Sequence, residues 1–276
     1  MMQTRARRSL VPVILIGIVA LYAILLVGVP VAAMLQAAFG KGITVFLSAL
    51  ITPDAIHAFA ITLLLASGAC AFNLIAGLVL AWVLVRQQFA GKRVLSALVD
   101  APFVIAPIII GAVLIIVFGR GGWLTIPGVH IAFALPGMLL AMIIVSMPFV
   151  TREVMPVLAE LGPEQEEGAY TLGAGRFYTF RRIVLPELRW ALLYGLAQTF
   201  SRALGEFGAI IVIGGAIQGV TETTTIYLFR ALDDRNAIGA YSASILLALL
   251  SAVLLSIMEV FNRRRPRAFV TEETSL

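Results

Sequence analysis

Long stretches without a charged residue are the feature that most constrains how this chain can fold. Five stretches of 19 to 31 residues contain no Asp, Glu, Lys or Arg: residues 10–39, 55–85, 101–119, 131–151 and 237–258. A helix needs about 20 apolar residues to cross the hydrocarbon core of a bilayer, so each stretch is a candidate span. A sixth apolar stretch, residues 190–217, is interrupted only by Arg202 and Glu206.

The composition agrees with this reading. Hydrophobic residues make up 61% of the chain and charged residues 13%, against about 45–50% and about 25% in soluble domains. Only structures that satisfy their own backbone hydrogen bonds are stable in lipid. The sequence therefore predicts an all-α membrane protein with six transmembrane helices. The first stretch follows three arginines but is too long for the apolar part of a signal peptide, so we expect a retained span.

The distribution of basic residues predicts the orientation. If both termini are cytoplasmic, fifteen of the 20 Lys and Arg residues lie on the cytoplasmic side and four on the outer side, as the positive-inside rule requires. We expect a basic cytoplasmic N-terminus (1–9), a transmembrane domain (10–262) and a cytoplasmic tail (263–276). The net charge of +5 then reflects topology and contact with anionic lipid rather than nucleic-acid binding.

Several kinds of chemistry have no support in the sequence. Cys70 is the single cysteine, and the chain has two histidines. We find no spacing typical of a metal site and no nucleophile beside a base. The Gly-rich phosphate-binding loop of P-loop ATPases is also missing. We expect no metal, no cofactor and no catalysis, including ATP hydrolysis, in this chain.

Residues 160–186 are the longest predicted cytoplasmic segment. Pro163 and the acidic residues after it are typical of a helix start, where carboxylates meet the positive end of the helix dipole. Gly173 and Gly175 favour its end. We expect a short helix on the membrane surface, followed by a second short helix (176–185) that ends at Pro186.

This pair of helices has two possible interpretations. Gly168 and Ala169 are small, so the first helix can approach a partner protein closely. Docking on a partner is therefore one interpretation. The other is an ordinary amphipathic loop between two spans.

A resemblance to a known family favours docking. One motif resembles the EAA loop of bacterial ABC importer permeases. It consists of Glu167-Gly168-Ala169, then Gly173 after three residues, then the Ile183–Pro186 segment after nine more. The spacing agrees throughout, and only Gly168 departs from the usual Ala. The resemblance implies a type I, MetI-like permease fold in the bacterial inner membrane, with this helix in a groove of an ATPase subunit. The coupling residues it implies are Glu164, Glu166, Glu167, Gly168, Ala169, Gly173, Ile183, Leu185 and Pro186.

Further segments are similar to the sulfate/thiosulfate permeases: residues 100–103, 121–123, 148–153, 189–195 and 201–209. Residues 121–123 and 148–153 resemble the W-type subunit. This implies half of a sulfate/thiosulfate pathway, with two ATPase subunits that bind ATP–Mg, a T-type second permease and a periplasmic sulfate-binding protein as partners. A molybdate/tungstate importer permease is the alternative, and an ATP-independent anion transporter is a third interpretation.

The fifth span carries the predicted pathway residues. Arg202 and Glu206 are four residues apart, so we expect them to share a helix face. Both are costly in hydrocarbon, which favours a position inside the bundle or along a wet pathway. Ser201, Arg202, Gly205 and Glu206 are therefore the predicted translocation path or gate. A purely structural ion pair is the alternative.

Two other polar features carry weaker expectations. Asp100 near the inner end of the third span is expected to be a helix-end or inter-span hydrogen-bonding residue, with a role in transport as the alternative. The outer segment 214–225 is rich in Gly and Thr. We expect it to be polar and flexible, either as a contact for a binding protein or as a simple turn.

Overall fold

The computed structural model describes residues 10–124 and 128–263, and every regular element in these ranges is a helix. Within them, four helices are long and apolar enough to cross a membrane, or six spans exist if each of two bent helix pairs counts as one. The all-α prediction is confirmed. The predicted N-terminus (1–9) and residues 264–276 of the predicted tail lie outside the described residues.

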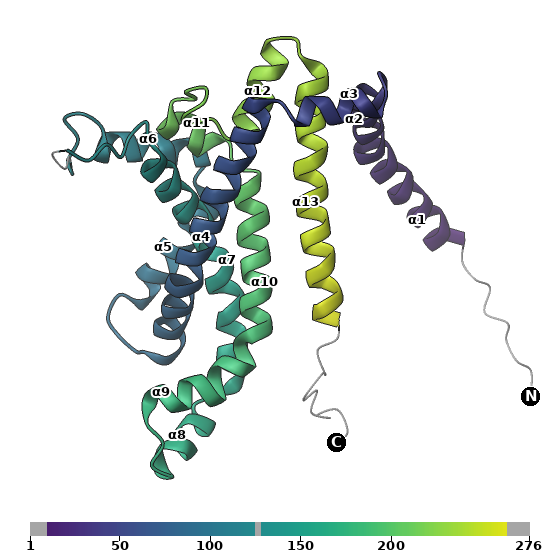
Figure 1. Ribbon diagram of the computed structural model, residues 1–276. Coiled ribbons are helices and arrows are strands. Elements are labelled where there is room, and N and C mark those ends of the chain that lie inside the picture. The colour runs from purple at the N-terminus through teal and green to yellow at the C-terminus, as the bar shows by residue number, and fades with distance from the viewer. Residues whose placement is uncertain (1–9, 125–127, 264–276) are drawn as a thin grey trace, which may run out of the picture.

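The start of the first span stands apart from the other helices, whereas its end contacts the last helix of the chain (Figure 1). It is built from three elements and followed by a short helix: α1 (Leu10–Ala23), the π-helical turn η1 (Ile24–Gly28), α2 (Val29–Phe39) and α3 (Ile43–Leu50). The π-helical turn precedes Pro30, which has no N–H to donate to the preceding turn. The most apolar stretch of this span buries no residue against the rest of the chain.

Three long helices form the centre of the molecule: α4 (Pro53–Arg86), α7 (Leu135–Leu161) and α10 (Leu185–Leu204). Thr52 caps α4 through its hydroxyl, which accepts a hydrogen bond from Ala55 N. Small residues allow close packing: a Cβ on Gly77 would lie 2.8 Å from Val150 Cβ, and one on Gly195 would lie 2.9 Å from Val150 Cα. Helices in lipid associate through such close contacts.

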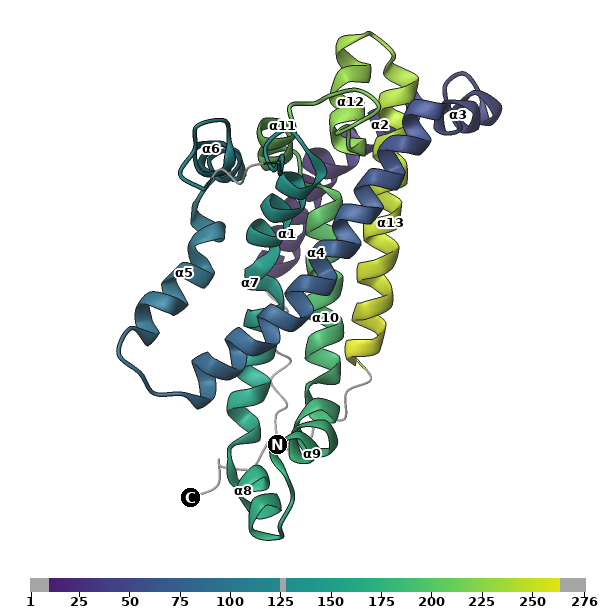
Figure 2. The ribbon, with the colours of Figure 1, turned by 60° about the vertical axis from the view of Figure 1, so that its left-hand side comes forward.

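The third span is not the straight helix that residues 101–119 predicted. α5 (Lys92–Val104) and α6 (Pro107–Phe118) are bent by 114° relative to each other (Figure 2). The 12 residues of α6 extend about 18 Å, which is short of a hydrocarbon core of about 30 Å. The break precedes Pro107, because proline forces the residue before it into an extended conformation.

The segment after α7 also differs from the prediction. α8 (Glu164–Thr171) is the expected surface helix, but the second short helix does not end at Pro186. Instead α9 (Arg176–Thr179), the π-helical turn η2 (Phe180–Val184) and α10 follow one another without a break. The π-helical turn accommodates Pro186 as η1 accommodates Pro30, so this proline lies inside a continuous helix.

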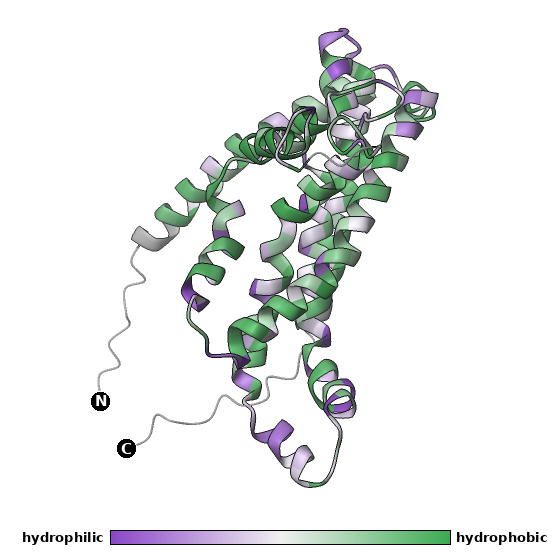
Figure 3. Cartoon of the chain, turned by 90° about the vertical axis from the view of Figure 1, so that its left-hand side faces the viewer, coloured by the Kyte–Doolittle hydropathy of each residue, from purple (hydrophilic) through white to green (hydrophobic). Residues whose placement is uncertain are grey.

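Two of the remaining three helices lie at the opposite end of the molecule, and the last one runs back toward α8 (Figure 1). The three are α11 (Gly208–Gly214), bent by 58° from the helix before it, then α12 (Thr224–Asp233) and α13 (Ala237–Arg263). We call the end that carries α8 the inner end and the end that carries α12 the outer end. Hydrophilic residues gather at both ends, and the helices between them are mainly hydrophobic (Figure 3). The first turn of α1 and the last turn of α13 both point toward the inner end (Figure 1), although the side of the membrane stays a prediction.

Candidate functional site

The inner end of the molecule carries α8 as a separate, projecting helix (Figure 1). Its C-terminus is closed by a Schellman motif: Gly173 N donates to Tyr170 O at 3.0 Å, and Ala174 N donates to Ala169 O at 3.0 Å. Gly173 has a φ of +85°, which costs a residue with a Cβ about 1–2 kcal/mol. The conformation therefore explains why glycine stands at this position.

Glu166 does not face outward as a docking residue would. Among the eight residues of α8, all of which the structure describes, Glu166 alone is buried. Its Oε1 accepts hydrogen bonds from Arg86 Nη2 at 2.8 Å and from Arg86 Nε at 3.1 Å. The Glu166 side chain is 7% exposed and that of Arg86 is 13% exposed. Glu166 therefore binds the end of α4 in this conformation, and its part in coupling to an ATPase stays a prediction.

The other acidic residues of α8, Glu164 and Glu167, are exposed, as is Gly168, while Ala169 is half-buried. A group of apolar and aromatic side chains is also exposed around α8 and α9: Tyr170, Leu172, Phe177 and Tyr178. Leu172 is 90% exposed. Sequence reasoning missed this surface, although four large apolar side chains within nine residues of a predicted cytoplasmic loop were a usable signal.

The last three predicted coupling residues lie at the base of this projection. Ile183 is half-buried in η2, and Pro186 is exposed. Leu185 packs against the inner core cluster formed by α4, α7 and α10. Their positions suit an anchor for the loop better than direct contact with a partner.

The fifth span is interrupted between Arg202 and Glu206. α10 ends at Leu204, Gly205 is its C-cap, and α11 begins at Gly208. The prediction that the two charged residues share a helix face is therefore wrong, because the helix stops between them. They still form an ion pair: Arg202 Nη1 lies 2.6 Å from Glu206 Oε2.

The two partners of this pair differ in exposure. The Arg202 side chain is 33% exposed and that of Glu206 is 1% exposed. The contact is close but not aligned as a hydrogen bond. The other carboxylate oxygen, Oε1, accepts a 2.8 Å hydrogen bond from Ala209 N in the first turn of α11. Glu206 thus caps α11 and neutralises Arg202 at once.

Ser201 and Gly205 flank this pair. The Ser201 hydroxyl is buried and has no hydrogen-bond partner among the described residues. Gly205 is exposed at the break. All four predicted pathway residues therefore lie at one place, the break in the fifth span, where an arginine head group remains partly accessible.

The outer segment 214–225 is more ordered by hydrogen bonds than the sequence suggested. Thr221 and Thr224 are fully buried. The Thr221 hydroxyl donates to Gly214 O at 2.7 Å, and the Thr225 hydroxyl donates to Glu206 O at 2.7 Å. The threonines hold the end of this segment against the helix break, while residues 215–220 are exposed and mostly in turns, which agrees with the expectation of a turn.

Arg230 on α12 organises the outer end. Its Nε donates to Glu222 Oε1 at 2.6 Å, and its Nη2 donates to Asp54 Oδ2 at 3.2 Å. The hydrogen bond with Glu222 raises the pKa of Arg230 above its usual value. These contacts join the start of α4 to α12 and keep Arg230 cationic.

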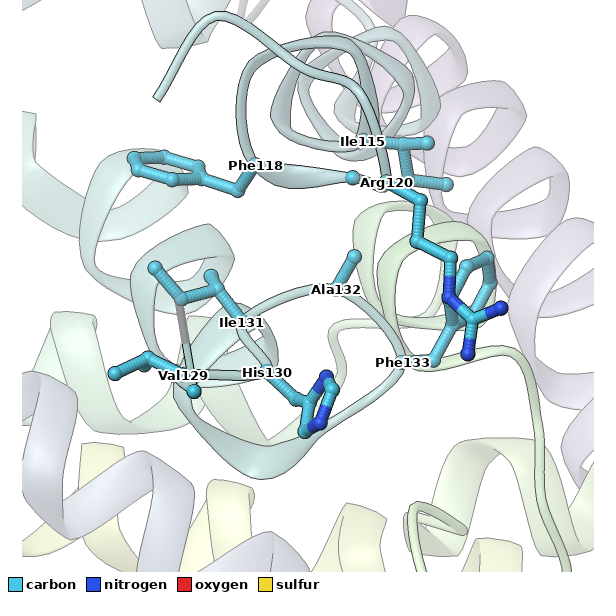
Figure 4. A pocket seen from close by; sticks show the side chains of 10 residues that line it. Ile115, Phe118, Arg120, Val129, His130, Ile131, Ala132 and Phe133 are labelled. Atoms are coloured by element: carbon cyan, nitrogen blue, oxygen red, sulfur yellow. The ribbon is translucent and has the colours of Figure 1, made fainter. Parts of the chain in front are cut away.

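A hollow lies between α6 and the segment that precedes α7. Two polar side chains, Arg120 and His130, line it among apolar side chains that include Ile115, Phe118 and Ile131 (Figure 4). Both polar residues are exposed. The hollow opens at the outer end, and its cationic rim distinguishes it from the acidic surface of α8.

The expected inter-span contact of Asp100 is present. Arg152 Nε on α7 donates to Asp100 Oδ1 on α5 at 2.6 Å, and Arg152 Nη2 donates to Ser96 Oγ at 3.0 Å. Asp100 thus fixes α5 against α7. Within the described ranges, no group of three or more His, Cys, Asp or Glu side chains is placed to hold a metal ion.

Comparison with known proteins agrees with this geometry. Residues 73–267 match the family described as binding-protein-dependent transport system inner membrane component. The chain is 40% identical over 255 residues to the sulfate transport system permease protein CysW of Synechocystis sp., covering 91% of this chain and 92% of that protein. It is 42% identical over 216 residues to CysT of Escherichia coli K12, covering 76% and 78%.

Solved structures extend the likeness to the fold. A bacterial ABC transporter involved in the import of the acidic polysaccharide alginate matches with a TM-score of 0.75 at 19% identity, covering 92% of this chain and 95% of that one. The ABC importer permease fold predicted from the sequence is confirmed. The matched family is the membrane component of such systems, so the chain is a permease rather than an ATPase. The chain belongs to the family of inner membrane components of binding-protein-dependent transport systems.

Proposed function

We propose that this chain is the permease subunit of an ATP-driven importer of sulfate or thiosulfate and forms half of its translocation pathway. The observation that carries the proposal is the likeness to proteins named sulfate transport permeases over 91% of the chain. The break in the fifth span supports it, because it leaves the Arg202 side chain partly exposed within a mainly apolar span. A divalent oxyanion needs such a group to enter an apolar environment.

The proposed complex contains two ATPase subunits, a second permease of the T type and a periplasmic sulfate-binding protein. The similarity to both CysW and CysT supports a pair of related permeases. The proposal includes no cofactor for this chain, since ATP–Mg would bind to the ATPase subunits.

We propose that α8 docks in a groove of the ATPase. Its outward surface combines the carboxylates of Glu164 and Glu167 with the small Gly168 and the exposed Leu172. An apolar groove with a basic rim complements this surface. Docking would bury Leu172, which is otherwise a cost in water, so the apolar side chain supplies affinity and the carboxylates supply orientation.

We propose that the anion passes beside Arg202. Glu206 already neutralises this arginine, so a passing sulfate must compete with a carboxylate that is held in place by Ala209 N. The attraction is enough to lower the barrier but too weak to trap a dianion. This arrangement suits a gate that releases its substrate, rather than a fixed binding site.

The proposal is tested with the complete complex in proteoliposomes. We expect uptake of radiolabelled sulfate or thiosulfate that requires ATP and the binding protein, and loss of uptake when residues 167–173 are deleted. The same vesicles are tested with molybdate and tungstate. Uptake of these anions in place of sulfate would move the substrate class to the alternative importer, and anion uptake without ATP would contradict the proposal altogether.

A further inference from the structure

The inner end of α4 contacts both arms of the loop that carries α8. Arg86, the last residue of α4, binds Glu166 in the first arm through two hydrogen bonds, of 2.8 and 3.1 Å. Trp82, one turn earlier, packs edge-on against Phe180 of η2 in the second arm, with ring centroids 5.9 Å apart. We propose that Trp82 and Arg86 form a clamp that fixes α8 to α4 and transmits its movement into the transmembrane core. We call these two residues the α4 clamp.

The clamp connects α8 directly to α4, while α8 otherwise contacts α9 and η2. Glu166 is the buried residue of α8, so it is the side chain of this helix that the clamp encloses. Arg86 Nη2 also donates to the carbonyl of Gly162 at 2.5 Å, at the C-cap of α7. One guanidinium therefore joins α4, the end of α7 and α8.

The chemistry of Arg86 suits this role. A guanidinium offers donors in a fixed plane, so it can hold a carboxylate and a carbonyl at the same time in one geometry. The Arg86 guanidinium lies 5.9 Å from the centre of the Trp82 ring, within the range of a cation–π contact. The two residues of the clamp thus also stabilise each other.

The helix behind the clamp is firmly packed. Leu84 and Ala81 of α4 are buried, and Ala81 belongs to the inner core cluster shared with α7 and α10. A displacement of α8 therefore reaches a rigid element, not a flexible connection. This inference rests on the proposed docking of α8 on an ATPase, and its test separates the two.

The first experiment needs no ATPase. Spin labels are placed on Leu172→Cys at the C-cap of α8 and on Val79→Cys in α4, both exposed positions, in the full chain with Cys70→Ser. We expect a narrow distance distribution that becomes broader with Arg86→Gln and with Glu166→Gln. The double variant Arg86→Glu/Glu166→Arg should narrow it again. Arg93→Gln, an exposed arginine at the same end, is the control and should change nothing.

The second experiment uses the complete complex and measures the amount of sulfate transported per ATP hydrolysed. We expect Arg86→Gln to lower this ratio about fivefold or more while ATP hydrolysis continues, and the charge reversal to recover part of it. A distance distribution as narrow in Arg86→Gln as in the parent overturns the clamp. A broadened distribution with an unchanged ratio overturns the transmission. Failure of ATP-driven uptake in the parent complex would contradict the proposed function. The spin-label experiment would still show whether the clamp holds α8.

Discussion

Two ion pairs with buried carboxylates, one at the inner end of α4 and one at the break after α10, show how differently this fold uses arginine. Arg86 and Glu166 are 80 residues apart, and the pair is nearly enclosed, with two aligned hydrogen bonds. Arg202 and Glu206 are four residues apart across a helix break, and the arginine remains one-third exposed. The first pair fixes the position of one helix against another. The second fixes a local break and leaves a cation accessible.

This difference assigns different roles to the two arginines. The Arg86 guanidinium is covered, and its Nε and Nη2 donate three hydrogen bonds to Glu166 and Gly162, so Arg86 acts on structure. A guanidinium in a single, poorly aligned ionic contact can exchange its partner, so Arg202 can act on a passing anion. Both carboxylates are buried, and each has a second structural role. Glu206 holds the backbone of α11 through Ala209 N, and Glu166 holds α8 against α4.

The largest expected effect comes from removing the carboxylate at the helix break. Glu206→Ala leaves Arg202 unpaired and Ala209 N uncapped, and we expect a loss of about 3 kcal/mol in the free energy of unfolding. Denaturant unfolding of the purified permease in detergent measures it. Glu206→Gln keeps an acceptor for Ala209 N and should lose less. Equal losses in both variants would show that the capping contact contributes nothing.

The next effect tests how tightly the break is held. A Cβ on Gly111 of α6 would lie 2.5 Å from Ala209 O, and the backbone cannot yield without moving α11. We expect Gly111→Ala to cost about 1–3 kcal/mol in unfolding free energy. Gly68→Ala is the matched control, since its Cβ would meet only the end of the Leu139 side chain, at 3.0 Å. Comparable thermal stability of the two variants would contradict this packing.

Replacing the exposed arginine tests whether its charge serves the passing anion. Arg202→Gln removes the accessible charge, and we expect sulfate uptake to fall about tenfold, which corresponds to ~1.4 kcal/mol in the barrier. Arg202→Lys keeps the charge and should retain more uptake. If Arg202→Gln weakens association with the second permease but leaves uptake per complex unchanged, the pair is structural only.

The smallest expected effects concern the two glycines of the α8 region. A Cβ on Gly168 would meet open space, so Gly168→Ala should stabilise α8 by up to about 1 kcal/mol through helix propensity. Gly173→Ala places a Cβ at a φ of +85° and should destabilise the helix end by about 1 kcal/mol. Hydrogen exchange of the α8 amides measures both, and protection that changes in the same direction in the two variants would contradict this account.

Most of the fold follows from apolar runs, because lipid imposes them on every spanning helix. The positions of breaks do not follow from such runs alone. Residues 101–119 are continuously apolar, yet the chain turns before Pro107, and Pro186 lies inside a helix because a π-helical turn accommodates it. Proline marks a local constraint, and the tertiary packing decides whether the helix bends, breaks or adapts.

The site was only partly predictable for a similar reason. Spacing placed Arg202 and Glu206 within reach of each other, but it could not reveal that the helix ends at Leu204. Likewise, the three acidic residues of α8 are equivalent in sequence, and only the position of Arg86 at the end of α4 separates Glu166 from its neighbours. Contacts between residues 80 positions apart leave no local signal in a single chain.

We propose that the anion passes the break at Arg202 and does not reach Arg86. The direct measurement is the rate at which a sulfonate-bearing thiol reagent modifies Gly205→Cys in a Cys70→Ser chain, in the complete complex, with and without sulfate. Gly205 is exposed and a Cβ there has ordinary contacts, so the ion pair stays intact; Gln87→Cys, beside Arg86, is the comparison. We expect sulfate to slow modification at position 205 and to leave the rate at position 87 unchanged. A rate at 205 that is indifferent to sulfate, or equal slowing at both positions, would contradict it.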